Sequence, residues 1–403
     1  MEVHNTIREV VKNNLALVQQ IRRHLHANPE LSFQEYKTSE YIKSWLNKWG
    51  IPYKDGYVKT GIVASIEGKN PSQKVIALRG DIDALPIQEK NNLEFCSKNN
   101  GVMHACGHDV HTASLLGVGK VLHQLKENIE GTVLLVFQPA EEKVPGGAKQ
   151  MLEEGALSNP KPQIVLGQHV MPGLTCGKIG FCGGKYFASV DEIYLTVKGK
   201  GGHAAMPDKV TDTVLMASQI IVAMQQLISR NAPPEIPSVL SFGRIEGLGA
   251  VNVVPETVTI GGTFRSMDEG WRHEGHKRIE EIAKLTAKSF GGTCEVEIRK
   301  GYPVLFNNEE LTELAKQITS DFLGGENVEK LPFEMISEDF AYFANEFPSV
   351  FYRLGISSNE QTTHPLHSPY FNIDEEALFT SIATMTNLTY QLLSNTNKFL
   401  KVK

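Results

Sequence analysis

The segment MHACGHDVH, residues 103–111, contains three histidines and one cysteine, in a 403-residue chain with only 13 histidines and five cysteines. Thiolate and imidazole groups are ligands for Zn, Co and Ni, and metal binding is one chemistry that this spacing allows. A Cys-x-His pair also occurs where a buried thiol simply packs like a small apolar residue. Taken alone, the segment leaves both interpretations open.

Carboxylates and another histidine follow three apolar segments. Asp81 and Asp83 come after KVIALRG, Glu141 and Glu142 after GTVLLVFQPA, and His169 at the end of QIVLGQH. Such segments are typical of buried β-strands, and the carboxyl ends of parallel strands share the edge of the sheet where ligands bind. Adjacent glutamates usually form a solvated face, but this pair follows an apolar strand and a proline. We therefore expect a metal site at this edge.

The elements that must position these residues suggest two domains. Strand and helix patterns alternate over residues 1–186 and again over residues 300–403, which predicts an α/β catalytic domain with a mainly parallel sheet. Helices are expected over residues 7–25, 32–50 and 109–126, among others. Residues 187–299 instead read β-α-β-β-α-β, the order of a ferredoxin-like domain inserted into the first.

Composition narrows the functional classes. The chain is 41% hydrophobic and 21% charged, with a formal net charge of −6, and it lacks the basic patches of nucleic-acid binding proteins. No segment is apolar enough to span a membrane, and the N-terminus does not resemble a signal peptide. The cysteines are odd in number and form no C-x-x-C pair, so free thiols are expected. These features predict a cytoplasmic protein that acts on small molecules.

Eight motifs together carry a family resemblance that covers nearly the whole chain in order. The motifs are GVMHACGHDVHTASLLG, FQPAEE, GGAKQMLEEGAL, GQHV, KGKGGHAAMP, VNVVPETVTIGGTFR, SEDFAYF and HPLHSPYFNIDE. With these motifs the chain resembles the aminoacylase-like branch of the M20 metallopeptidases, which includes N-acyl-amino-acid amidohydrolases, hippurate hydrolases and plant hydrolases of auxin conjugates.

This resemblance implies two divalent metal ions per subunit, Zn or Mn first and Co or Ni as further candidates. Asp83 matches a carboxylate that orients a ligand. Asp81 stands where the two-zinc peptidases place a ligand histidine, and it is left out of the ligand set. The residues that match metal ligands are Cys106, His108, Glu142, His169 and His367.

The resemblance also implies catalytic and substrate-binding roles. Glu141 matches the general base. His203 matches a histidine that reaches the partner subunit's active site and binds the substrate carbonyl, so a homodimer or a larger homo-oligomer is expected. Asn252 and Arg265 match positions that bind the substrate carboxylate. Without the family, a turn histidine, a capping asparagine and a strand-end arginine would be the ordinary interpretations.

The predicted function is metal-dependent hydrolysis of N-acyl-L-amino acids. A dipeptidase or carboxypeptidase of the same family is the alternative within the enzyme class. A catalytically inactive protein that binds amino-acid conjugates is a second alternative. The presence of Glu141 argues against it, because a protein that only binds has no role for this second glutamate. A third alternative makes Cys106 a nucleophile, which leaves Glu141, Glu142 and His169 without roles.

Overall fold

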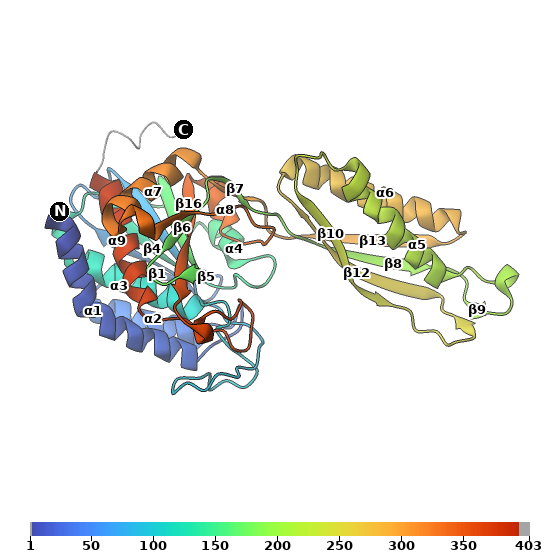
Figure 1. The fold of residues 1–403 in the computed structure, drawn as a ribbon, viewed down its shortest axis with the longest axis horizontal. Coiled ribbons are helices and arrows are strands. Elements are labelled where there is room, and N and C mark those ends of the chain that lie inside the picture. The colour runs from blue at the N-terminus through green and yellow to red at the C-terminus, as the bar shows by residue number, and fades with distance from the viewer. Residues whose placement is uncertain (1, 395–403) are drawn as a thin grey trace. The chain divides into compact units, whose positions relative to one another are not determined.

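The computed structural model describes residues 2–394, and the chain divides into two compact units. The first unit is formed by Met1–Gly184, Phe306–Pro332 and Asp339–Lys403, and the second by Lys185–Leu305 and Phe333–Glu338 (Figure 1). The expected insertion at 187–299 differs from the second unit by a few residues at each end. The short segment Phe333–Glu338 joins the second unit as well, which no sequence pattern indicated.

An eight-stranded sheet forms the centre of the first unit. Its central strands β4, β3, β5 and β16 run parallel to one another, and the pairs β1/β2, β2/β4 and β16/β6 are antiparallel. The strand order is β1 (Tyr53–Tyr57), β2 (Gly61–Glu67), β4 (Thr132–Gln138), β3 (Val75–Asp81), β5 (Ile164–Thr175), β16 (Ser349–Ser357), β6 (Ile179–Phe181) and β15 (Val328–Lys330). Two further strands, β7 (Gly184–Phe187) and β14 (Leu305–Asn307), pair separately.

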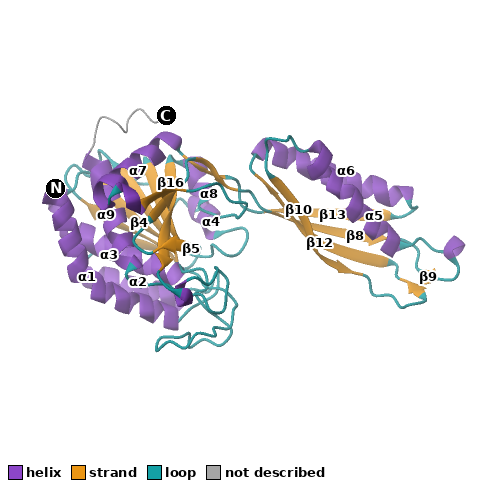
Figure 2. Ribbon diagram, in the orientation of Figure 1, coloured by secondary structure: helices purple, strands orange, loops and turns teal. Residues whose placement is uncertain are grey.

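Helices cover both faces of this sheet, as Figure 2 shows. Alternate residues of the strands, such as Ile76 and Leu78 in β3, are buried in one core cluster with the apolar faces of the long helices. The long helices are α1 (Glu2–Ala27), α2 (Tyr36–Trp49), α3 (His108–Gln124), α7 (Glu309–Leu323) and α9 (Ala377–Ser394); the short helices are α4 (Gly147–Glu153) and α8 (Ala341–Glu346). Within residues 2–394, no helix combines the length and apolar character needed to cross a membrane.

The second helix starts later than its sequence pattern predicts. The pattern placed it over residues 32–50, but α2 begins at Tyr36, after the N-cap residue Glu35. The reason is local, because Phe33 adopts a left-handed conformation with φ of 67° that a helix cannot contain. Residues 32–35 therefore form a turn whose polar groups face the site described below.

The second unit has the predicted β-α-β-β-α-β order. Its four-stranded sheet is antiparallel throughout, in the order β10-β12-β8-β13, and alternate residues of β8 pack against the two helices. The elements are β8 (Asp191–Lys198), α5 (Thr213–Gln226), β10 (Ser238–Glu246), β12 (Thr257–Ser266), α6 (Glu269–Ser289) and β13 (Thr293–Lys300). A small ladder joins β9 (Gly202–His203) to β11 (Val253–Val254).

A buried ion pair fixes the start of α3, the helix that carries His108. Arg22 Nε of α1 lies 2.7 Å from Asp109 Oδ2, and both side chains are fully buried. His26 Nδ1 lies 2.9 Å from the same oxygen. Burial opposes the ionisation of Asp109, but the charges of Arg22 and His26 prevail and hold its pKa well below the usual range. The first turn of α3 is thereby tied to α1.

We expect Asp109→Leu to destabilise the first unit by about 3–5 kcal/mol, because the buried Arg22 would lose its 2.7 Å partner and keep the longer 3.3 Å contact with Glu375. Urea unfolding followed by circular dichroism measures the loss. The double variant Arg22→Met with Asp109→Leu should be more stable than Asp109→Leu alone, since it also removes the buried charge. Wild-type stability in the single variant would show that the pair does not hold the helix.

Candidate metal centre

The polar residues that follow β3, β4 and β5 lie close together in the structure. These strands are neighbours in the sheet, in the order β4-β3-β5. Asp81 is the last residue of β3, the Glu141–Glu142 turn follows β4, and His169 lies within β5. Each of these side chains except Glu142 is buried. The sheet thus places acidic and imidazole groups from three strands at one edge, next to the start of α3.

Cys106, His108 and His169 form the first candidate ligand group. One ligand atom from each lies within 4.8 Å of the other two, and Cys106 Sγ is 3.4 Å from His169 Nε2. Gly107 separates Cys106 from His108 in a left-handed conformation, with φ of 80°, immediately before α3. A Cβ at this position would lie 2.6 Å from a Val170 methyl group, so the turn that aims both ligands requires glycine.

Cys106 also belongs to a second candidate group, with Glu142 and His367. His367 Nε2 lies 3.1 Å from Glu142 Oε1, and the half-exposed His367 side chain is the most accessible member of the cluster. The His367 backbone N–H donates to the Ala105 carbonyl over 2.9 Å, which attaches this C-terminal loop to the cysteine segment. Cys106 is therefore common to both candidate groups.

Glu141 lies beside these groups without being part of either. Its carboxylate lies within 4.8 Å of ligand atoms of His108 and Glu142, and the side chain is only 6% exposed. The two adjacent glutamates therefore reach the same small volume from one turn. Only Glu142 is also grouped with Cys106 and His367.

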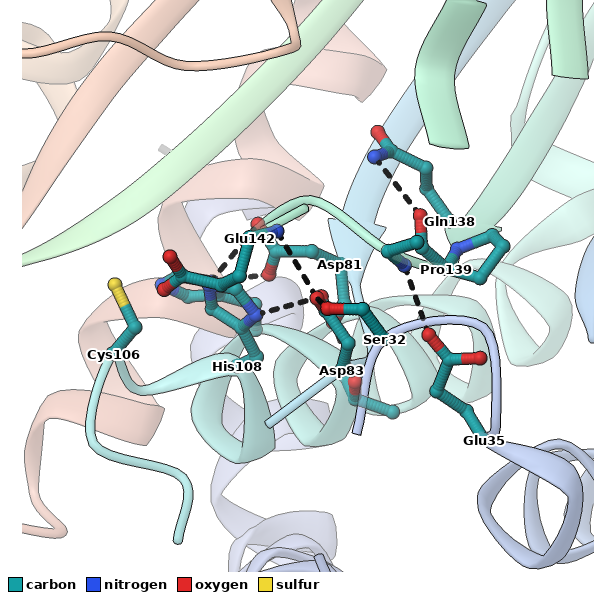
Figure 3. Close-up of polar contacts among 12 residues, drawn as sticks. Ser32, Glu35, Asp81, Asp83, Cys106, His108, Gln138, Pro139 and Glu142 are labelled. Carbon is teal, nitrogen blue, oxygen red and sulfur yellow. Dashed lines mark hydrogen bonds and ion pairs between the residues drawn. The ribbon is translucent and has the colours of Figure 1, made fainter. Parts of the chain in front are cut away.

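Asp83 orients two of the candidate ligands, as Figure 3 shows. Its Oδ1 lies 3.1 Å from His108 Nδ1, while its Oδ2 accepts hydrogen bonds from Ser32 Oγ at 2.7 Å and from the Glu142 backbone N–H at 3.1 Å. When a ligand histidine hydrogen-bonds a carboxylate through the ring nitrogen that does not bind the metal, the carboxylate fixes the orientation and the tautomer of the ring. Asp83 is thus placed to support ligands rather than to act as one.

The donor atoms fit divalent metal ions. With Nδ1 of His108 directed to Asp83, its buried Nε2 has no hydrogen-bond partner among the described residues. His169 Nδ1 lies 2.7 Å from the Val170 carbonyl, which leaves Nε2 facing Cys106. Lone pairs of two imidazoles, a thiol and a carboxylate therefore converge, which is a typical donor set for zinc and related ions.

His111 and Asp81 form a neighbouring pair that the sequence analysis did not assign. His111 Nδ1 lies 2.6 Å from Asp81 Oδ1, and His111 Nε2 accepts a hydrogen bond from the Val170 backbone N–H at 2.9 Å. The other Asp81 oxygen binds Arg79. Although these residues can be grouped with His108 as metal donors, their own atoms are already engaged. The i, i+3 spacing of His108 and His111 on one helix was the signal available in the sequence.

Charge and burial strongly perturb the titration of the cluster. Burial lowers the pKa of His108, but the charges of Asp81, Asp83 and Glu142 outweigh it and raise this pKa to about 10. Burial and the charges of Glu142 and Glu141 raise the pKa of Cys106 well above its usual value. Protons therefore occupy positions that ions would take, and metal binding must release them.

The residues expected to bind substrate lie in the second unit, at two separate places. His203 and Val253 are paired in the β9/β11 ladder, and the Asn252 carbonyl accepts a hydrogen bond from Ala204 N–H at 2.9 Å, so His203 and Asn252 are neighbours. Arg265 lies at the other end of β12, where it donates to the Met335 carbonyl over 3.0 Å. The strand between Thr257 and Arg265 spans about 27 Å.

Together, the sheet, the inserted unit and the buried Cys-His-Glu cluster are those of a two-domain metal-dependent hydrolase. Residues 77–391 match the family model for Peptidase family M20/M25/M40, and the chain belongs to this family. It is a metal-dependent amidohydrolase, as the sequence analysis predicted.

Two relatives and one solved structure illustrate the similarity. The N-acyl-L-amino acid amidohydrolase of Geobacillus stearothermophilus is 42% identical, covering 72% of this chain and 77% of its own length. The IAA-amino acid hydrolase ILR1-like 5 of Arabidopsis thaliana is 38% identical, with 96% and 92% covered. The structure of a dinuclear metal-binding peptidase of the M20 family from Bacillus subtilis has a TM-score of 0.80 at 33% identity, with 95% and 99% covered.

If Cys106 is a ligand, Cys106→Ser should lower metal occupancy after reconstitution with Zn or Mn, because a hydroxyl is a poorer ligand than a thiolate. Inductively coupled plasma mass spectrometry after desalting measures the occupancy. Cys96→Ser is the matched control, since Cys96 lies outside the candidate ligand groups and its Sγ bonds backbone groups of Asn91 and Leu93, which a serine can also do. Equal occupancy in both variants would remove Cys106 from the ligand set.

Proposed function

We propose that this enzyme hydrolyses the amide bond of N-acyl-L-amino acids, with water as the nucleophile and Glu141 as the general base. The observation that carries the proposal is the arrangement of the two glutamates. Both lie within 4.8 Å of His108 ligand atoms, but only Glu142 is also grouped with Cys106 and His367. One glutamate can therefore hold metal while its neighbour takes up and returns a proton. The names of the relatives above supply the substrate class.

In this proposal two divalent ions, Zn or Mn, occupy the cluster. Ions of this kind lower the pKa of water and polarise a carbonyl group. Asp83 keeps the His108 ring oriented for its ion. The proposed ligands are Cys106, His108, Glu142, His169 and His367.

Glu141 moves the proton. It accepts the proton of the attacking water as the water oxygen bonds to the acyl carbon, and it returns that proton to the nitrogen of the leaving amine as the C–N bond breaks. A carboxylate that also ligated a metal would be a poor base, which is why the reaction needs two glutamates. The products are a carboxylic acid and a free amino acid.

We propose that substrate binding uses two subunits. His203 would donate to the carbonyl oxygen as negative charge develops there, and Asn252 and Arg265 would bind the free carboxylate. Within one chain Arg265 and His203 lie at opposite ends of a strand of about 27 Å, farther apart than a small substrate can span. A homodimer resolves this separation if His203 and Asn252 of one subunit join Arg265 of the other.

The surface of the second unit supports such a homodimer. β10 is an edge strand of its sheet, and edge strands readily pair with a second chain. Large apolar side chains are exposed on the neighbouring α5, among them Val214, Leu215 and Val222. We further propose a cytoplasmic location, because a reducing compartment keeps the Cys106 thiol available for metal.

The alternative with Cys106 as a nucleophile has one geometric feature in its favour, the 3.4 Å contact with His169. The electrostatics oppose it. Burial and the nearby glutamates raise the pKa of Cys106, while burial and neighbouring positive charges lower the pKa of His169, so the pair stays neutral. A reactive thiolate requires the opposite shifts. A dipeptidase or carboxypeptidase activity remains the second candidate, and dipeptides belong in the substrate panel.

We expect Glu141→Ala to lower kcat by roughly 10²-fold or more, the scale for losing a general base, with metal content unchanged. Glu142→Ala should instead lose metal. Steady-state kinetics on N-acetyl amino acids, together with metal analysis of both proteins, measures the difference. Equal metal loss in the two variants would show that the roles assigned to the glutamates are wrong.

Mixing two inactive variants tests the shared active site. After subunit exchange, His203→Ala and Glu141→Ala chains should form mixed dimers in which one of the two sites is intact. Equal mixing should restore about a quarter of wild-type activity if the sites act independently. Native mass spectrometry confirms the exchange, and exchanged but inactive mixtures would show that His203 serves its own chain or has no catalytic role.

A further inference from the structure

We propose that Glu35 is a positioning residue that aims Glu141 by holding the backbone of Ala140. This inference rests on the proposed roles of the two glutamates. Glu35 lies at the N-terminus of α2, far from the metal-ligand motifs in the sequence, and its side chain is fully buried.

The Glu35 carboxylate accepts three hydrogen bonds from three separate segments. Its Oε1 accepts from the backbone N–H groups of Phe33 and Ala140, each at 2.9 Å, and its Oε2 accepts from Thr60 Oγ1 at 2.9 Å. Figure 3 shows the contact with the residue after Pro139. One oxygen therefore joins the turn before α2 to the turn that carries Glu141.

Both backbone donors to Oε1 are in a conformation that residues other than glycine rarely adopt. Phe33 has φ of 67° and Ala140 has φ of 53°, both in the left-handed region. Such conformations persist only where surrounding contacts impose them. The shared Oε1 is one contact that holds both residues in this conformation, and the Gly147 N–H, which donates to the Ala140 carbonyl at 3.0 Å, is a second contact for Ala140. Without the Glu35 contact, we expect the φ of Ala140 to shift towards negative values and to rotate the peptide that leads into Glu141.

The residues on either side of Ala140 are anchored by other contacts. Before it, the Gln138 side chain donates to Asp339 at 2.8 and 2.9 Å. After it, the Glu142 backbone N–H donates to Asp83 at 3.1 Å. Both flanks of the turn are thus anchored, and Glu35 holds the residue between them that directly precedes the proposed base.

Glu35 is held at an energetic cost, which fits a residue retained for function. Burial and the charge of Asp83 raise its pKa to about 7 from an ordinary value of 4.5. The folded state therefore favours the protonated form, and wild-type stability should fall as pH rises from 4.5 to 7. A glutamine at this position removes that loss and keeps an oxygen acceptor of the same reach.

Two variants of Glu35 separate the effect of side-chain length from the effect of its charge. Glu35→Gln keeps the acceptor oxygen in place and removes the charge. Glu35→Asp keeps the charge, but its shorter side chain moves the acceptor oxygen away from the Ala140 N–H. We expect kcat within about twofold of wild type for Glu35→Gln and a loss of about 10- to 10²-fold for Glu35→Asp, the scale for small misplacements of catalytic groups. KM and metal content should change little in either. A residue that acted through its charge would give the reverse order.

A second substitution tests the route through Ala140. Glycine adopts left-handed φ without penalty, so Ala140→Gly should recover at least about threefold of the kcat that Glu35→Asp loses. Thr60→Val is the matched control, because it removes only the hydrogen bond to Oε2 and should leave kcat near wild type. Thermal unfolding at pH 5 and pH 8 should show Glu35→Gln gaining stability over wild type mainly at pH 8.

Wild-type kcat in Glu35→Asp, or no recovery on adding Ala140→Gly, would overturn the inference. Failure of the proposed function would look different, because Glu141→Ala would then retain activity whatever the Glu35 variants do. If Glu141→Ala is inactive and Glu35→Asp is fully active, only the positioning role is wrong.

Discussion

Asp83 is the residue on which the geometry of the metal centre depends. Its two oxygens contact the His108 ring, the Ser32 hydroxyl and the Glu142 backbone, which belong to a helix, to the turn before α2 and to the turn after β4. Because a single buried acceptor serves all three, a shift in one segment is transmitted to the others. Glu35 likewise joins separate segments through its carboxylate, at a greater distance from the candidate ligands.

The accumulation of acidic groups explains why the site needs cations. Asp81, Asp83 and Glu141 are buried near one another, and Arg79 and His108 are the positive groups close to Asp81. Burying carboxylates together is unfavourable unless positive charge accompanies them. The proton on His108 partly meets this need, and divalent ions meet it more fully. Folding and metal affinity are therefore coupled through the same few charges.

Much of this arrangement could be predicted from the sequence, because it depends on patterns within short segments. Apolar runs located β3, β4 and β5, and the polar residues after them located the edge where the cluster lies. What could not be predicted depends on contacts between distant segments. Glu35 gave no signal, since its partners Thr60 and Ala140 are remote in sequence. The separation of Arg265 from His203 was equally hidden, because motifs do not report which end of a strand a residue occupies.

The tight packing under the Glu141–Glu142 turn constrains how this protein can diverge. A Cβ on Gly147 would lie 1.8 Å from the Pro139 carbonyl oxygen, so any side chain there would displace the turn. Residues on the surface of the second unit can be substituted one at a time while selection changes the substrate preference of the enzyme. The packing of the turn does not allow such stepwise substitution at Gly147. A lineage that abandons catalysis is free to replace either glutamate immediately, yet it must keep the glycine for as long as it keeps the fold. Gly147 would then persist as a relic of the lost activity.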